Sequence, residues 1–186
     1  MNKLLLPKGF KNVTSLEEKL HTRPEKDWSK MGEMRALKLF HAMSERVPAY
    51  KDFLKKNSFK PDYVKSIKDF SKIPPIDKDN YLRAYTLPML CWDGEFRGKP
   101  WTISTTSGST GEPFYFPRNE SQDWQYAISA ELYLRSNFDI QNKSTLYIVA
   151  FPMGAWIGGL FTYEALKIIA ETRNYNLSII TPGVHK

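Results

Sequence analysis

Residues 106–113 read Thr106-Ser107-Gly108-Ser109-Thr110-Gly111-Glu112-Pro113 and are the most informative part of the sequence. Its first six residues are all Ser, Thr or Gly, and its two glycines permit unusual backbone angles and a close approach to a ligand. Successive backbone N–H groups in such a turn form a concave site for an anion, to which the four hydroxyls add donors. A triphosphate suits such a site, although the composition alone is also typical of a solvent-exposed linker.

The order of these residues and their position argue against a linker. The run lies between two predicted strands rather than between domains, and Thr-Ser-Gly-Ser-Thr-Gly-x-Pro is far more specific than an excess of small polar residues. It lacks the Gly-x-x-x-x-Gly-Lys-Ser/Thr pattern, so a P-loop NTPase is not indicated. The sequence therefore predicts a phosphate-binding loop of another kind.

Strands and helices alternate after this run. The helical segment that follows it carries Trp124, Ile128 and Leu132 on one side. Two later apolar runs are typical of buried parallel strands, and the helix between them indicates a right-handed βαβ unit, so we predict an α/β fold. The predicted elements of this part are strands at 102–104, 114–116, 146–151 and 177–180 and helices at 120–138 and 161–172.

The first 90 residues are mainly helical in pattern. Helical spacing from about Ser29 is broken at Pro48, so a second helix is expected to begin there; the periodic positions are Leu37, Phe40, Met43 and Val47. Ser66 and Asp77 are predicted to cap two short helices, the second of which spans 78–85. Residues 1–30 have few periodic apolar positions and are predicted to be a loosely packed lead-in.

Charge is distributed unevenly along the chain. The net charge is +7, and residues 1–80 hold 18 Lys and Arg against 11 Asp and Glu, whereas the remainder holds nine of each kind. The lysines mostly alternate with acids, which favours a solvated helical surface. Nucleic-acid binding is the alternative, but no concentrated basic block or reading motif supports it, so we expect no nucleic-acid partner.

Cysteine and histidine usage excludes several classes of site. Cys91 is the single cysteine, so neither a disulfide framework nor a thiolate metal site can be built, and a reducing, cytoplasmic location is expected. The first ten residues contain only a three-leucine apolar run, which is too short for a signal peptide. His21, His41 and His185 show no ligand spacing, and we predict no metal-ligating residues.

A charge-free run over Thr145–Tyr163 raises a membrane alternative. Its length is close to that of a bilayer span, and it contains a Gly-x-x-x-Gly spacing that packed membrane helices share. Pro152 and three glycines interrupt it, its first half is β-prone, and no basic cluster flanks it. We therefore expect no membrane partner.

The run at 106–113 resembles the nucleotide-binding loop of the adenylate-forming (AMP-binding) ligases, which include acyl- and aryl-CoA synthetases, luciferases and peptide-synthetase adenylation domains. Many members follow the proline with lysine and glycine, whereas Phe114 and Tyr115 stand here. This departure is similar to the phenylacetate–CoA ligase branch and its capsule-biosynthesis-like relatives. Three further segments resemble that branch, namely Val47-Pro48-Ala49-Tyr50-Lys51, the stretch from Ile67 to Lys78, and Phe151 to Leu160 with its glycine-rich turn.

The resemblance implies an ATP-binding site. In the family this loop wraps the β- and γ-phosphates of ATP, and the corresponding residues are Thr106, Ser107, Gly108, Ser109, Thr110 and Gly111. Arg118 lies close enough in sequence to reach a phosphate, or else is a surface arginine beside a strand. The turn residues Phe151, Gly154, Trp156 and Gly158 would line the pocket of a carboxylic acid, although ordinary core packing explains the aromatic pair equally well.

The resemblance also implies what the chain is part of. We expect a mainly helical segment over 1–92 and the incomplete start of an AMP-binding α/β subdomain over 93–186. The parent enzyme would join a small-molecule carboxylic acid to ATP with Mg²⁺ and release pyrophosphate, and CoA would then accept the acyl group. The family's later acidic, Thr-Glu and lysine residues have no counterpart before residue 186, so no catalytic residue is assigned and we expect the chain to be inactive alone.

Two alternatives remain at this point. One is a non-catalytic module that binds a nucleotide or another anion, and the other is an interaction protein built on the charge-free run. An open sheet that ends after its first strands would also expose an edge, which makes a homo-oligomer a reasonable expectation.

Overall fold

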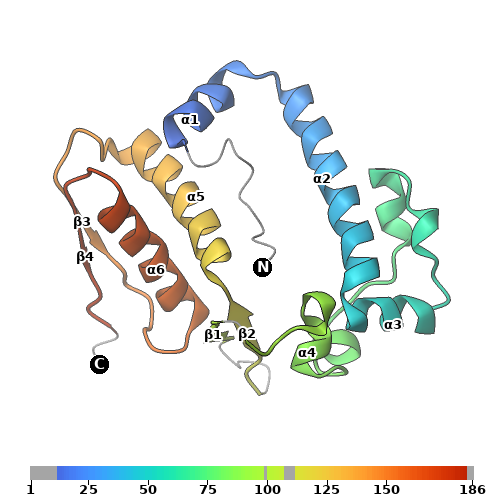
Figure 1. Cartoon of the computed structure of the whole chain (residues 1–186). Coiled ribbons are helices and arrows are strands. Elements are labelled where there is room, and N and C mark those ends of the chain that lie inside the picture. The colour runs from blue at the N-terminus through green and yellow to red at the C-terminus, as the bar shows by residue number, and fades with distance from the viewer. Residues whose placement is uncertain (1–11, 99, 107–111, 184–186) are drawn as a thin grey trace. The chain divides into compact units, whose positions relative to one another are not determined.

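The computed structural model describes residues 12–98, 100–106 and 112–183. The chain forms two compact units (Figure 1). Unit 2 is Arg23–Lys99, and unit 1 consists of the described parts of Met1–Thr22 and Pro100–Lys186. The predicted division into 1–92 and 93–186 stays a prediction, and the two units are described separately below.

Unit 2 is mainly helical, as predicted. The long helix α2 and the shorter α3 are separated at Val47, and Pro48 occupies the first turn of α3, where its missing N–H has no intrahelical partner to lose. The elements are α2 (Glu25–Arg46), α3 (Pro48–Lys56), η2 (Pro61–Tyr63), η3 (Ile67–Lys72), η4 (Lys78–Leu82), α4 (Leu87–Leu90) and η5 (Trp92–Gly94). Its core is largely aromatic and includes Phe40, Tyr50, Phe53 and Tyr81.

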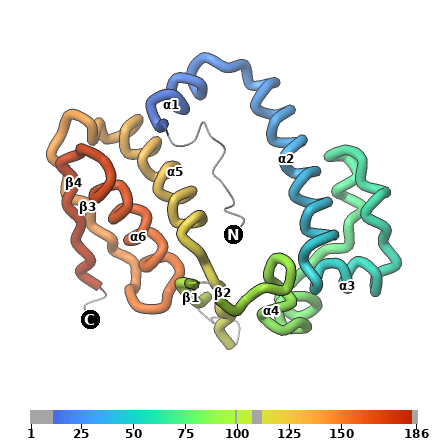
Figure 2. Tube along the Cα trace, viewed as in Figure 1, coloured from blue at the N-terminus to red at the C-terminus, as the bar shows by residue number. Residues whose placement is uncertain are grey.

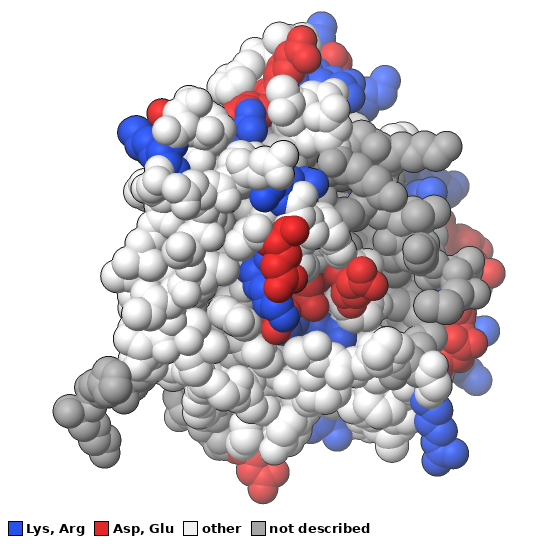
Figure 3. Space-filling model, turned by 60° about the vertical axis from the view of Figure 1, so that its left-hand side comes forward, with Lys and Arg blue, Asp and Glu red and all other residues white. Residues whose placement is uncertain are grey.

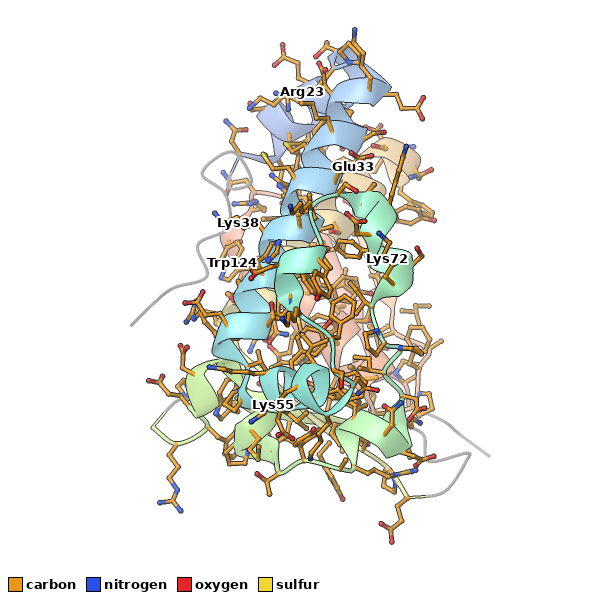
Figure 4. The ribbon with its side chains drawn as sticks, turned by 90° about the vertical axis from the view of Figure 1, so that its right-hand side faces the viewer. Arg23, Glu33, Lys38, Lys55, Lys72 and Trp124 are labelled. Atoms are coloured by element: carbon orange, nitrogen blue, oxygen red, sulfur yellow. The ribbon has the colours of Figure 1, made fainter. Side chains whose placement is uncertain are left out.

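Both predicted caps of unit 2 are confirmed. Ser66 and Asp69 form a capping box at η3, and Asp77 accepts hydrogen bonds from the N–H groups of Asp79 and Asn80 at η4. The prediction of a solvated charged surface is also confirmed. Figure 4 labels Lys38, Lys55 and Lys72, which come from α2, α3 and η3 and are all exposed. Exposed ion pairs join Lys56 to Asp52 and Lys72 to Asp69, each at 2.7 Å.

Unit 1 combines helices with two small sheets, which agrees with the predicted α/β class. Strands β1 and β2 form an antiparallel pair, and β3 and β4 form a parallel pair joined by α6, as predicted for a βαβ unit. Figure 2 shows α5 and α6 side by side, and their mutual packing buries Ala127, Leu134, Leu166 and Ile169. The elements are α1 (Val13–Thr22), β1 (Thr102–Thr105), β2 (Tyr115–Arg118), α5 (Glu120–Phe138), β3 (Thr145–Ile148), α6 (Ile157–Thr172) and β4 (Leu177–Ile180).

The predicted lead-in over 1–30 is wrong for its described part. Residues 13–22 form α1, which buries Val13 and Leu16. Arg135 of α5 donates to the carboxylate of Glu17 on α1 through Nε at 3.0 Å and Nη2 at 2.7 Å. Both donors share one carboxylate oxygen, Oε2, and this charge-assisted contact joins α1 to a helix that lies over a hundred residues away in sequence.

Three details of the predicted α/β part differ from the structure. Ile128 of the predicted side of α5 is buried, but Trp124 and Leu132 are only partly buried, and the buried side also includes Asp123 and Glu131. The strand predicted at 146–151 is shorter, because β3 ends at Ile148. Helix α6 begins at Ile157 rather than at residue 161, because its first turn is built from glycines that the sequence pattern assigned to a loop. No helix within the described ranges is long and apolar enough to span a bilayer.

The parallel sheet of unit 1 has one covered face and one open face, so the prediction of two buried strands is wrong for every second residue. Tyr147 and Ile179 point towards the core formed with α5 and α6. Leu146, Ile148 and Ile180 lie on the other face, where their exposed fractions are 62%, 56% and 47%. The elements α6, β3 and β4 come forward in Figure 3, and much of the surface seen there carries no charged side chain.

Candidate functional site

Three consecutive residues anchor the start of the run at 106–113. The hydroxyl of Ser104 accepts a hydrogen bond from Arg118 at 2.6 Å, and the N–H of Thr105 donates to the carbonyl of Ala155 at 2.7 Å. Thr106 donates its N–H to the carbonyl of Phe114 and accepts the N–H of Phe114 on its Oγ1, both at 3.1 Å. The segment between Thr106 and Phe114 is therefore closed at its base by a pair of hydrogen bonds.

The same anchoring brings two predicted sites together. Thr105 and Trp156 form an isolated parallel bridge, so the start of the predicted phosphate loop lies against the predicted acid-binding turn. The sequence separation of these residues is 51 positions, and no local pattern indicates their contact. Of the predicted phosphate ligands, Thr106 is described and lies at the base of the loop. Ser107, Gly108, Ser109, Thr110 and Gly111 lie outside the described residues, so their assignment stays a prediction.

The turn that precedes α6 carries the four predicted acid-binding residues. Gly154 has a φ of +89°, a conformation that favours glycine. Phe151 and Trp156 are 52% and 39% exposed, so neither is packed as a core residue. A Cβ built on Gly158 would lie 3.6 Å from the Phe151 ring, which is ordinary contact. The four residues thus form an exposed aromatic turn beside β1.

Gly159 was not predicted as a site residue, although it holds this turn against α6. A Cβ built on Gly159 would lie 2.3 Å from the carbonyl oxygen of Pro152 and 3.0 Å from the Sδ of Met153. Only a glycine lets the first turn of α6 approach the backbone of the 151–155 segment this closely. The Gly-Gly pair in the sequence is the signal that could have indicated it.

Arg118 is a buried residue, so the prediction of a surface arginine is wrong. The residue is 3% exposed, and its Nε donates to Asp123 Oδ1 at 3.1 Å while its Nη1 donates to Ser104. Its Cζ lies 4.3 Å from the centroid of the Phe161 ring. Its Nη2 is buried and has no hydrogen-bond partner among the described residues. The alternative prediction, a direct phosphate contact, stays untested.

A second buried network stabilises the helices behind the site. Glu131 is 2% exposed and accepts hydrogen bonds from Arg173 at 3.0 and 3.1 Å and from the hydroxyl of Tyr175 at 2.7 Å. Tyr175 in turn accepts a hydrogen bond from Arg135 at 3.0 Å. Burial raises the pKa of Tyr175, and the hydrogen bond to Tyr175, followed by that to Glu17, raises the pKa of Arg135. This network joins α1, α5 and the connection from α6 to β4.

A cavity of about 290 Å³ lies between α5, α6 and β3, and its lining includes Tyr126, Tyr133, Tyr147 and Thr162. Burial raises the pKa of Tyr147, and the hydroxyls of Tyr126 and Thr162 lie 3.1 Å apart. Within the described ranges, no group of three or more His, Cys, Asp and Glu residues is placed to hold a metal ion.

Comparisons with known proteins identify the fold. No protein-family model and no curated protein matches the chain. Among solved structures, the chain is similar to 2-hydroxyisobutyryl-CoA ligase in complex with 2-HIB-AMP and CoA in the thioesterification state, with a TM-score of 0.65 and 21% identity over 89% of this chain and 34% of that one. The postadenylation state of that ligase with 2-HIB-AMP gives a TM-score of 0.64 and 19% identity over 89% and 33%.

This likeness confirms the predicted fold class. The chain has the fold of part of 2-hydroxyisobutyryl-CoA ligase, and it spans about a third of the length of the solved structures that it matches. At this level of identity the likeness concerns the fold, so function must be argued from the site.

Proposed function

We propose that this chain is part of an ATP-dependent ligase that activates a carboxylic acid as its adenylate, and that the run at 106–113 binds the ATP phosphates. The observation that carries the proposal is the hydrogen bond from Thr105 to Ala155, which places the start of the run beside the exposed aromatic turn. An enzyme that joins an acid to ATP needs the phosphate site and the acid site next to each other. The fold shared with a CoA ligase supports the same function.

In this proposal one group of residues binds the charged phosphates and another group shapes the pocket for the acid. The N–H groups and hydroxyls of Ser107 to Gly111 would donate to the β- and γ-phosphates, and Mg²⁺ carried by those phosphates would neutralise their charge. The exposed rings of Phe151 and Trp156 offer an apolar wall to the acid, and Gly154 and Gly158 keep the space beside them free of side chains. The two hydrogen bonds between Thr106 and Phe114 hold Thr106 in place before a nucleotide binds, which lowers the entropy cost of ordering Thr106.

The branch of the ligase family, the kind of acid and the acyl acceptor are proposed from the sequence. Phe114 and Tyr115 after the proline favour the phenylacetate–CoA ligase branch, so we propose an acid with an apolar or aromatic group and CoA as the acceptor of the acyl group. A cytoplasmic location fits a chain with one cysteine. The activity belongs to the parent enzyme, and we expect this chain to bind nucleotide without catalysing the complete reaction.

Replacing Ser109 and Thr110 by alanine will abolish most of the affinity for ATP–Mg²⁺. Each hydrogen bond to a charged phosphate contributes about 1.5–3 kcal/mol, so the Ser109→Ala/Thr110→Ala variant should bind on the order of 100-fold more weakly or worse. Titration calorimetry on the complete chain measures this change.

The matched control is the Ser129→Ala/Thr172→Ala variant, because both hydroxyls are exposed and bond only to a carbonyl one helical turn earlier. Its affinity should equal that of the wild type. Equal affinities of all three proteins would place the nucleotide elsewhere and contradict the proposal. Binding by the parent enzyme without release of pyrophosphate would instead favour the non-catalytic nucleotide-binding module.

The open face of the parallel sheet is also expected to cause self-association of the isolated chain. Leu146, Ile148 and Ile180 expose apolar side chains next to each other on β3 and β4, which pair only with one another among the described residues. A Leu146→Lys/Ile148→Lys variant should shift the chain from dimers or larger species towards monomers in sedimentation velocity runs. A wild-type chain that remains monomeric at high concentration would contradict a homo-oligomer.

A further inference from the structure

Arg118 connects four elements of unit 1 through one side chain. Arg118 is the last residue of β2. Its guanidinium donates hydrogen bonds to Ser104 on β1 and to Asp123 on α5, and the same group lies over the ring of Phe161 on α6. The Arg118 side chain is 4% exposed and that of Asp123 is 11% exposed. The guanidinium is therefore held rigidly, with three neighbouring elements fixed around it.

Stability alone does not account for this arrangement. A buried ion pair is often replaced by apolar side chains with no loss of stability, because its desolvation offsets its attraction. Here the desolvation is also incompletely compensated, since Nη2 is buried without a partner among the described residues. The buried guanidinium instead fixes the positions of Ser104 and Asp123 relative to each other, because its planar fork bonds to both side chains.

Arg118 orients Ser104, which is the first of the three residues that fix the start of the predicted phosphate loop. Ser104 has no exposed surface and lies in β1 immediately before Thr105 and Thr106. Those two residues bond to Ala155 and Phe114 and so fix the start of the loop against the aromatic turn and against its own end. A shift of Ser104 would therefore move both of the contacts that bring the two sites together.

We propose that Arg118 is a positioning residue for Thr106 and Phe114, which bound the predicted phosphate ligands, and that it acts through Ser104 rather than through contact with the nucleotide. This inference rests on the proposed function for its consequence in ATP binding, whereas its structural part, the fixing of Thr106 against Phe114, stands by itself. Lysine cannot replace arginine in this role, because a single ammonium group does not reproduce the planar fork that serves Asp123 and Ser104 together.

The test measures hydrogen exchange at the amides of Thr106 and Phe114, the two donors that close the loop. In Arg118→Lys and in Ser104→Ala, exchange at both amides should become roughly five- to tenfold faster, the factor expected for the loss of one hydrogen bond. Ser104→Ala removes only a hydroxyl, so it remains informative if Arg118→Lys folds poorly. Arg173→Lys is the matched control, because Arg173 also bonds to a buried carboxylate of α5, and the other described contact of its side chain is with the ring of Trp124 on the same helix.

The control should lower the thermal midpoint without accelerating exchange at either amide. Unchanged exchange in Arg118→Lys together with a lowered midpoint would overturn the proposal, because Arg118 would then act on stability alone. In the double variant, Ser104→Ala should add little to the effect of Arg118→Lys, since both remove the same contact. Additive effects would overturn the claim that Arg118 acts through Ser104.

Nucleotide binding provides the second arm of the test. Where the wild-type chain binds ATP–Mg²⁺, Arg118→Lys should weaken binding by on the order of tenfold or more, and Arg173→Lys should not. Equal affinities of wild type and Arg118→Lys would overturn the proposal. If the folded wild-type chain binds no nucleotide, the proposed function fails, and the exchange measurements still decide whether Arg118 positions the loop.

Discussion

Replacing Gly159 by alanine will destabilise unit 1 by about 2 kcal/mol or more, while the same change at Gly158 will be neutral or stabilising. The Cβ of an alanine at 159 would overlap the backbone carbonyl of Pro152 at 2.3 Å, and a backbone atom cannot move aside as a flexible side chain can. At 158 the nearest atom is the Phe151 ring at 3.6 Å, so the higher helix propensity of alanine should contribute up to about 1 kcal/mol.

The two variants differ only in the position of one methyl group, so each serves as the control for the other. Urea unfolding followed by near-UV circular dichroism would give both changes in the free energy of unfolding. Because the turn that Gly159 supports also carries Ala155, the Gly159→Ala variant should bind nucleotide more weakly even below its unfolding transition. Equal stabilities of the two variants would show that α6 does not lie against the 151–155 segment.

Replacing Glu131 by glutamine will destabilise unit 1 by about 3 kcal/mol. Removing one partner of a buried ion pair leaves the other charge uncompensated, which typically costs about 3–5 kcal/mol. The Arg173 side chain is 26% exposed and can reach water, so we expect the lower end of that range. The neutral amide can still accept from Tyr175, which isolates the loss of charge from the loss of the tyrosine contact.

An exposed pair at the end of the same helix provides the comparison. Lys143 and Asp139 are 4.0 Å apart, with side chains that are 66% and 41% exposed. Lys143→Ala should change the free energy of unfolding by less than about 0.5 kcal/mol, because surface ion pairs contribute little. A loss in Glu131→Gln no larger than that in Lys143→Ala would contradict the structural role of the buried network.

The elements predicted best are those specified by local signals. Helix α5 and strand β4 have the predicted bounds, and the capping boxes at Ser66 and Asp77 occur where short-range hydrogen bonds dictate them. Pro48 likewise separates two helices by its backbone chemistry alone. Each of these signals acts over a few residues, so no knowledge of the tertiary structure is needed to interpret it.

The errors arise where distant residues decide the structure. Helix α1 has few apolar positions, and its Glu17 is bound by Arg135 of a helix far away in sequence. Asp123 and Glu131 lie on the buried side of α5 because each pairs with an arginine from another element. Periodicity assumes that charged residues face water, and it fails when a counter-charge supplied by the fold makes their burial tolerable.

The candidate site could be predicted only in parts. The order of residues at 106–113 indicated the phosphate loop, and the glycines after Phe151 indicated the turn. Their proximity depends on the contact of Thr105 with Ala155, which no pattern in either segment reveals. Arg118 was interpreted as exposed because the sequence does not show that Ser104 and Asp123 surround it.

The central claim is that the 106–113 run binds the phosphates of ATP beside the turn at 151–158. An NMR titration of the complete chain with ATP–Mg²⁺ tests it most directly, because every backbone amide reports its own surroundings. We expect saturable shift changes centred on the amides from Thr106 to Phe114, with smaller changes at Ala155 and Trp156 and none in the core of unit 2. A folded chain that shows no shift changes in these segments, or whose changes centre on the charged helices of unit 2, would contradict it.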